Sequence, residues 1–69
     1  MTFQLNGQEY IELMKLLKFM GLTDTGGDTK QAIDDGLVEV NGQQEFRRRC
    51  KLRAGDEVVF EDTTITIEP

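Results

Sequence analysis

The sequence predicts an α+β fold in which two packed helices cover one face of a small antiparallel or mixed sheet. Three observations carry this prediction. Apolar residues follow a helical spacing early in the chain, the pattern changes to strand-like alternation after Gly36, and glycine-containing turns separate short alternating runs thereafter. An order of one strand, two helices and a meander of strands is typical of helices packed on one face of a sheet. A chain of 69 residues is expected to form a single domain, residues 1–69.

The first elements are a strand and a helix. Residues 2–5 alternate polar and apolar side chains, which predicts a short strand with Phe3 and Leu5 inward. The dipeptide Asn6-Gly7 ends this strand, and Asn6 with Glu9 has capping-box spacing, so a first helix is predicted from Gln8 to Met20. Gly21 followed by Leu22 predicts a left-handed C-cap with its hydrophobic contact.

A shorter second helix is predicted from about Gly26 to Asp35. Thr25 and Asp28 again have capping-box spacing, and Gly36-Leu37 repeats the preceding stop signal. Asp34 and Asp35 lie at the end where the helix dipole disfavours acidic side chains. We therefore expect a nearby arginine to compensate them.

The rest of the chain is predicted to be strands and turns. Residues 37–40 form a strand with Val38 and Val40 inward, and Asn41-Gly42 is the signature of a type I′ hairpin turn. A strand follows over residues 46–53, with Phe46, Cys50 and Leu52 on the inner face and Arg47, Arg49, Lys51 and Arg53 on the outer face. Turns at Gly55-Asp56 and Asp62-Thr63 delimit two further strands, the first with Val58 and Phe60 inward and the second over residues 64–68.

Charge is distributed unevenly along the chain. The net charge is −5, but residues 46–53, here called the basic strip, hold five of the eight cationic residues and no acid. An acidic body with one concentrated basic strip can attract a polyanion locally while it stays soluble and monomeric. The alternative is that the strip is only the solvated face of a strand.

Composition disfavours several function classes. The chain has no histidine and one cysteine, so the commonest general base and the usual metal-ligand sets are missing, and we expect no enzyme, metal or cofactor. Alternation places Cys50 inward, where a thiol behaves as a small hydrophobe. Apolar runs do not exceed three residues and Met1 is not followed by a signal peptide, so a cytoplasmic binding module without membrane contact is expected.

Two adjacent glycines open the second helix, although glycine weakens helices. Gly26-Gly27 either lets the helix pack tightly against a neighbour or leaves a bare helix N-terminus that can approach a phosphate. Lys30, one turn further on, supports the second interpretation, whereas Asp28 opposes it unless it only caps the helix. We favour the second interpretation.

These pieces together resemble a known family. The segments that carry the resemblance are Thr25-Gly26-Gly27-Asp28-Thr29-Lys30, Ile33, Gly36, Val38-Glu39-Val40-Asn41-Gly42, Arg47-Arg48-Arg49 and Gly55-Asp56-Glu57-Val58. They are similar to the RNA-binding domain named after small-subunit ribosomal protein S-four, in its small free-standing bacterial branch of YaaA/YbcJ-like proteins. The resemblance covers about residues 8–60.

The resemblance implies the alpha-L RNA-binding fold and a translation- or ribosome-associated role in binding structured RNA, ribosomal or transfer RNA. Carried over by position, the implied RNA-binding residues are Thr25, Gly26, Gly27, Lys30, Asn41, Arg47, Arg48, Arg49 and Lys51. Many members have a Ser-Arg pair where this chain has Gly-Gly-Asp, so one basic contact is missing at the start of the second helix. A possible protein partner is not identified.

The mode of RNA recognition follows from the residue types. Arginine and lysine side chains would contact phosphates, and Tyr10 and Phe19 are expected to pack rather than to stack bases. Recognition of RNA shape with modest sequence preference is therefore predicted, and about five neutralised phosphates would give a log–log salt slope near −4. The alternative is a small β-grasp-like protein-interaction domain without carrier chemistry, which would leave the arginines unexplained.

Overall fold

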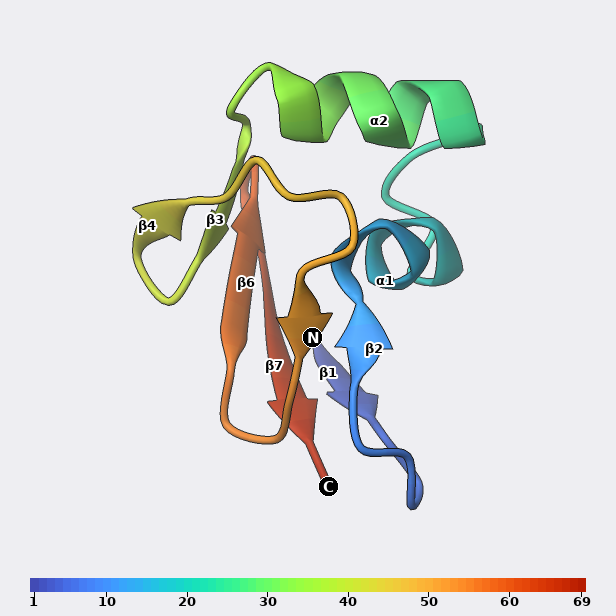
Figure 1. Ribbon diagram of the computed structural model, residues 1–69, viewed down its shortest axis with the longest axis vertical. Coiled ribbons are helices and arrows are strands. Elements are labelled where there is room, and N and C mark those ends of the chain that lie inside the picture. Colours follow the sequence, from blue (N-terminus) through green and yellow to red (C-terminus); the bar gives the residue numbers. More distant parts are fainter.

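The computed structural model describes residues 1–69 (Figure 1). Two helices, α1 (Leu13–Phe19) and α2 (Gly26–Asp34), interrupt a series of short strands. The strands are β1 (Thr2–Gln4), β2 (Ile11–Glu12), β3 (Val38–Val40), β4 (Gln43–Gln44), β5 (Lys51–Leu52), β6 (Glu57–Phe60) and β7 (Thr63–Glu68). Neither helix is long and apolar enough to cross a membrane.

Five strands form a mixed sheet in the order β1-β7-β6-β3-β4, and β2 pairs with β5 in a separate antiparallel ribbon. Within the larger sheet only β1 and β7 are parallel. Figure 1 shows α2 lying across one end of this sheet, with α1 and the β2–β5 ribbon beside it. The predicted α+β fold, two helices with a mixed sheet, is confirmed.

One hydrophobic core joins the helices to the inner face of the sheet. It contains 13 buried residues: Leu5, Leu13, Leu16, Leu17, Ala32, Ile33, Val38, Cys50, Leu52, Val58, Phe60, Ile65 and Ile67. The register places Val38 opposite Phe60 and Val58 opposite Ile65, so alternate residues of three strands share this face. Inward positions predicted for Leu5, Val38, Val58, Phe60, Cys50 and Leu52 are confirmed, and Phe3 and Val40 pack partly buried against the core.

The first helix begins five residues later than predicted. Asn6 and Gly7 both have positive φ, +52° and +91°, so Asn6 lies in a turn and does not cap a helix. Ile11 and Glu12 instead pair with Leu52 and Lys51 in the β2–β5 ribbon. The prediction was wrong because a distant segment, which the sequence pattern of residues 6–12 does not reveal, provides the partners of this stretch.

The predicted strand over residues 46–53 is also wrong, since only Lys51–Leu52 is a strand. Residues 45–50 form an irregular segment, and the side chain of Phe46 points out of the core, with 55% of the residue exposed. Its ring lies so close to Gly36 that a Cβ added there would approach a ring carbon to 3.1 Å.

The predicted stop signals of both helices and the predicted N-cap of the second helix are confirmed. Thr25 Oγ1 accepts a hydrogen bond from the Asp28 amide at 3.1 Å. At the end of α2, the amides of Gly36 and Leu37 donate to the carbonyls of Ile33 and Ala32, which is the Schellman pattern. The same pattern ends α1, where the Gly21 and Leu22 amides donate to the carbonyls of Lys18 and Leu17.

The hairpin turns agree with the sequence except at one position. Asn41 and Gly42 both have positive φ, as a type I′ turn requires. The last hairpin turns at Glu61-Asp62, one residue before the predicted place, because Phe60 pairs with Thr63.

Candidate nucleic-acid interface

The basic strip is held against α1 through its backbone. The amides of Leu13 and Met14, the first two of α1, donate to the carbonyls of Cys50 and Arg48 at 2.9 and 3.0 Å. These carbonyls satisfy amides that a helix leaves without internal partners, and no side chain caps α1. The irregular segment 45–50 is thus fixed in place, and the side chains of Arg47, Arg48 and Arg49 lie at the surface.

Arg47 is paired with a carboxylate of its own segment. Its Nε and Nη2 atoms donate to the two oxygens of Glu45 at 2.9 and 3.0 Å, and the Arg47 amide also donates to Glu45. The hydrogen bonds from the Arg47 side chain lower the pKa of Glu45 to about 2, and burial of the carboxylate opposes this shift. The same pair raises the pKa of the Arg47 guanidinium.

Arg48 is the arginine that compensates the acidic end of α2. Its Nε donates to Asp34 Oδ1 at 3.1 Å, and its Nη2 donates to Asp34 Oδ2. Hydrogen bonding to Arg48 lowers the pKa of Asp34, and the charges of Arg48 and, more weakly, Lys30 act in the same direction. The predicted compensating arginine is confirmed at Asp34, whereas Asp35 accepts a hydrogen bond from Gln31.

Arg49 and Lys51 belong to none of the three ion pairs of the chain. With Arg47 and Cys50 they line an open hollow of about 480 Å³. Cys50 forms the floor of this hollow, since the residue is buried, and burial raises the pKa of its thiol. A concavity edged by three cations over an uncharged floor suits a phosphate group, because arginine and lysine form charge-assisted hydrogen bonds with its oxygens.

The start of α2 lies at the other end of that helix from Arg48. Gly26 and Asp34 are eight residues apart, which corresponds to about 12 Å along a helix axis. Lys30 lies between them on the same stripe, four residues from each. The structure therefore places Lys30 and the glycines along one side of α2, with Arg48 at its far end.

The two glycines of α2 are not needed for close packing. A Cβ added at Gly26 would meet no atom within 4 Å, and one at Gly27 would meet only Thr25 Oγ1 at 3.7 Å, an ordinary contact. The tight-packing interpretation therefore has no support here. As the first two residues of the helix, Gly26 and Gly27 have amides without intrahelical acceptors.

The side chain of Asn41 is engaged within the protein. Its Nδ2 donates to Asp56 Oδ1 at 3.1 Å, and its Oδ1 accepts from the Glu57 amide at 2.9 Å. These bonds join the β3–β4 turn to the start of β6, away from α2. Among the nine residues implied by the resemblance, Asn41 thus has a structural role within the protein.

Tyr10 and Arg53, which are not among the nine implied RNA-binding residues, lie close to Lys51 of β5 or to its aromatic neighbour. Lys51 Nζ is 5.0 Å and Arg53 Cζ 5.7 Å from the centroid of the Tyr10 ring. Neither the sequence pattern nor the resemblance indicated Tyr10, because it was expected inside the first helix. The expectation that Tyr10 and Phe19 pack holds only in part, since Tyr10 is half-buried and Phe19 is 73% exposed, although Phe19 meets Phe3 edge-on with centroids 5.3 Å apart.

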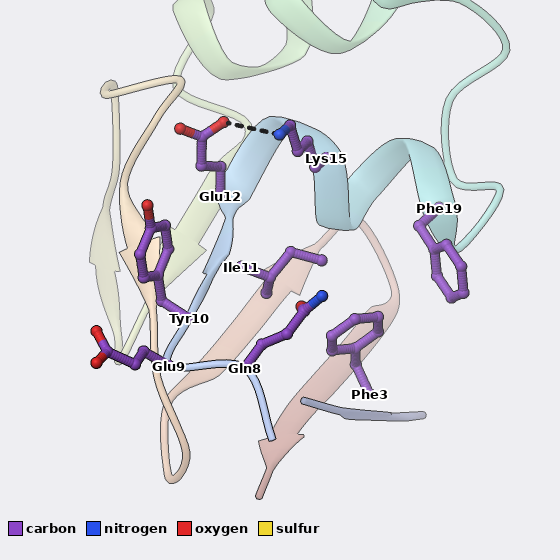
Figure 2. A pocket seen from close by; sticks show the side chains of 8 residues that line it. All are labelled: Phe3, Gln8, Glu9, Tyr10, Ile11, Glu12, Lys15 and Phe19. Atoms are coloured by element: carbon purple, nitrogen blue, oxygen red, sulfur yellow. Dashed lines mark ion pairs between the residues drawn. The ribbon is translucent and has the colours of Figure 1, made fainter. Parts of the chain in front are cut away.

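The largest hollow of the molecule, about 670 Å³, has a different character (Figure 2). Phe3, Ile11 and Phe19 provide its apolar part, and Glu9 and Glu12 bring carboxylates to it. Glu12 forms an ion pair with Lys15 at 3.7 Å, drawn as a dashed line in Figure 2. This mixed acidic and apolar lining does not favour a polyanion. No group of three or more histidine, cysteine or acidic side chains could hold a metal ion.

The chain is similar to several known proteins. Residues 3–68 match the family model of the S4 domain. The YbcJ protein of Escherichia coli K12, named as a candidate RNA-binding protein, is 39% identical over 66 residues, which cover 96% of this chain and 94% of that protein. YbcJ of Shigella flexneri, named as uncharacterized, has the same identity and coverage. The solution structure of E. coli YbcJ, described as revealing an alphaL motif involved in RNA-binding, superposes with a TM-score of 0.75 and 38% identity, covering 99% of this chain and 86% of that one.

Proposed function

The chain belongs to the S4 domain family, and from this premise we propose that it is a non-catalytic RNA-binding module. In this proposal residues 1–69 act as one unit that recognises structured RNA, ribosomal or transfer RNA, in the cytoplasm. The contacts come from the basic strip and from the glycine-opened start of α2. The two curated relatives are bacterial, and the E. coli protein is the one named for RNA binding.

The observation that carries the proposal is the hollow edged by Arg47, Arg49 and Lys51. Arg49 and Lys51 have no acidic partner, so their charges remain available to an anion. The backbone that presents them is held by the two hydrogen bonds from α1. A fixed backbone reduces the entropy lost on binding, since only the side chains must then be ordered.

Arg47 and Arg48 contribute differently. Each already donates to a carboxylate, so a phosphate would have to replace or share Glu45 or Asp34. Arg48 and Asp34 are each nearly half exposed, so water screens their attraction and the exchange costs little there. Glu45 is only 15% exposed, so freeing Arg47 from it costs more. We assign to these two arginines a supporting role, and to Arg49 and Lys51 the leading one.

The start of α2 forms the second part of the proposed surface. The amides of Gly26 and Gly27, the N-cap residue Thr25 and the ammonium of Lys30 would hold a further phosphate, as helix N-termini commonly do. The space beside Gly26 supports this assignment, because a Cβ added there would meet no atom within 4 Å. Asn41 would act indirectly, by stabilising the turn that its side chain joins to β6.

A fluorescence-anisotropy titration at two or more salt concentrations tests the proposal. The ligands are a ribosomal RNA hairpin, a transfer RNA and an unstructured strand of equal length. We expect wild type to bind the two structured RNAs more tightly than the strand, with a log–log slope near −4 if about five phosphates are neutralised. The slope should shrink by about 0.7 to 0.9 for each lost phosphate contact.

The variants separate the parts of the surface. Arg49→Ala with Lys51→Ala should weaken binding more than Arg47→Ala with Arg48→Ala, and Gly26→Ala should weaken it without loss of fold. Lys18→Ala on α1 removes one charge that no ion pair uses and is the matched control. Absence of salt-dependent binding, or equal binding by every variant, would contradict the proposal.

A protein-interaction domain is the second candidate function. It is favoured by the exposed ring of Phe19 beside the largest hollow. Failure of wild type to bind any of the three RNAs would bring this candidate forward.

A further inference from the structure

The outer face of the β2–β5 ribbon carries a cluster of one aromatic and two cationic side chains. The register pairs Ile11 with Leu52 and Glu12 with Lys51, and continuing it by one residue sets Tyr10 opposite Arg53. Leu52 is fully buried, whereas Lys51 and Arg53 are exposed. Tyr10 therefore meets both cations on the outer side of the ribbon.

The geometry is that of a double cation–π contact. Lys51 Nζ lies 5.0 Å and Arg53 Cζ 5.7 Å from the Tyr10 ring centroid, both within the range of about 6 Å in which such contacts stabilise. The Tyr10 ring is uncharged, so its contacts with Lys51 and Arg53 leave the combined charge of the two cations at +2. In contrast, Arg47 and Arg48 are held by carboxylates that cancel their charge locally.

Neighbouring groups leave the two cations available. Glu12 lies opposite Lys51 in the ribbon, but its carboxylate is paired with Lys15 at 3.7 Å. Asp56 accepts from the backbone amide of Arg53 and from Asn41 Nδ2, and forms no ion pair with the Arg53 guanidinium. No acidic side chain forms an ion pair with Lys51 or Arg53.

We propose that Lys51 and Arg53 bind neighbouring phosphates of one RNA strand and that Tyr10 is the residue that positions them. Two residues along a strand are about 6.6 Å apart, which is close to the spacing of successive phosphates along a nucleic-acid backbone. The ring restricts the two long side chains before RNA arrives, which lowers the entropy cost of ordering them. This assignment rests on the proposed function and extends its surface from the hollow along β5 to Arg53.

The test uses the same RNA hairpin with five single variants. Arg53→Gln removes the new contact, and Lys18→Gln removes a charge on α1 as the matched control. Tyr10→Leu removes the ring, Tyr10→Phe keeps it without the hydroxyl, and Arg49→Ala reports on the hollow. Affinity and salt slope are measured for each, and circular dichroism verifies that each variant is folded.

We expect Arg53→Gln to reduce the magnitude of the slope by about 0.7 to 0.9, and Lys18→Gln to leave it unchanged. Tyr10→Leu should weaken binding about twofold to tenfold, and Tyr10→Phe should retain wild-type affinity. A second readout is the proton NMR spectrum without RNA. The ring should shift the Lys51 Hε and Arg53 Hδ signals upfield in wild type and in Tyr10→Phe, and this shift should vanish in Tyr10→Leu.

The outcomes separate the two proposals. If wild type binds and Arg49→Ala weakens it, but Arg53→Gln behaves like Lys18→Gln, the function stands and this inference is overturned. Equal losses in Tyr10→Phe and Tyr10→Leu would overturn the role of the ring. If Tyr10→Leu does not fold, the slope of Arg53→Gln and the NMR shifts in Tyr10→Phe still decide. If wild type does not bind RNA, both proposals fall.

Discussion

Arg48 joins two segments that are 14 residues apart, because its guanidinium donates two hydrogen bonds to the carboxylate of Asp34. Asp34 is the last residue of α2, where the negative end of the helix dipole opposes an acidic side chain. The ion pair neutralises this carboxylate and anchors the basic strip to the helix. A residue taken from the sequence as an RNA contact thus also has a structural partner.

The first prediction concerns this pair. Arg48→Ala should lower the melting temperature modestly, since an exposed pair contributes little in water but its loss leaves Asp34 uncompensated at the helix end. Adding Asp34→Asn to Arg48→Ala should recover most of the loss. Thermal unfolding by circular dichroism in low and high salt measures both effects, and an Arg48→Ala protein as stable as wild type at low salt would show that the pair contributes nothing.

Acid should release the Glu45–Arg47 pair. The folded protein lowers the pKa of Glu45 from 4.5 to about 2, so the pair's contribution is complete above about pH 4.5 and is lost as the pH falls toward 2. The difference in unfolding free energy between wild type and Glu45→Gln should therefore shrink over this interval and stay constant above it. Urea unfolding of both proteins at several pH values measures the difference, and a gap that does not vary with pH would argue against a depressed pKa.

Glycine should be required at Gly36 and dispensable for the fold at Gly26. Gly36 has φ +74°, and a Cβ there would lie 2.9 Å from Gln44 Nε2 and 3.1 Å from the Phe46 ring, so Gly36→Ala should cost about 1 to 2 kcal/mol or more. Gly26→Ala meets open space in a helical conformation and should stabilise by up to about 1 kcal/mol. Chemical denaturation measures the unfolding free energy of both variants. The prediction is contradicted if the two substitutions change this free energy in the same direction.

The side chain of Asn41 should matter for stability before it matters for RNA. Asn41→Ala removes two hydrogen bonds and places alanine at φ +53°, so a loss of about 1 to 3 kcal/mol is expected. Asn41→Gly tolerates the backbone and should lose less. Both are measured by urea unfolding. If Asn41→Gly is folded and stable yet binds RNA much more weakly than wild type, the side chain has a direct contact with RNA.

Local signals in the sequence were reliable where a few neighbouring residues decide the conformation. The cap at Thr25, the two glycine stops and the Asn41-Gly42 turn all follow from hydrogen bonds or φ values within about six residues. The inward positions of Val58, Phe60 and Leu52 follow from the two-residue period of a strand beside a core. The net charge of −5 gives no sign of the basic strip, but the order of the residues shows it directly.

Long-range pairing was not available from the sequence. Residues 8–12 have a helical apolar pattern, yet Ile11 and Glu12 pair with a strand about 40 residues away, and carbonyls of that distant segment replace the expected cap of α1. Residues 46–50 alternate like a strand, yet Arg48 and Cys50 turn their carbonyls to α1 and Phe46 lies over Gly36.

The sequence by itself determined the N-cap of α2, the stops of both helices, the Asn41-Gly42 turn and the concentration of cations in residues 46–53, because each depends on neighbouring residues. Only the tertiary structure decided which of those cations have acidic partners, and that Tyr10 meets Lys51 and Arg53. The physical reason is that charge pairing and cation–π contact act over a few ångströms in space. Separation along the chain does not reveal which side chains come that close.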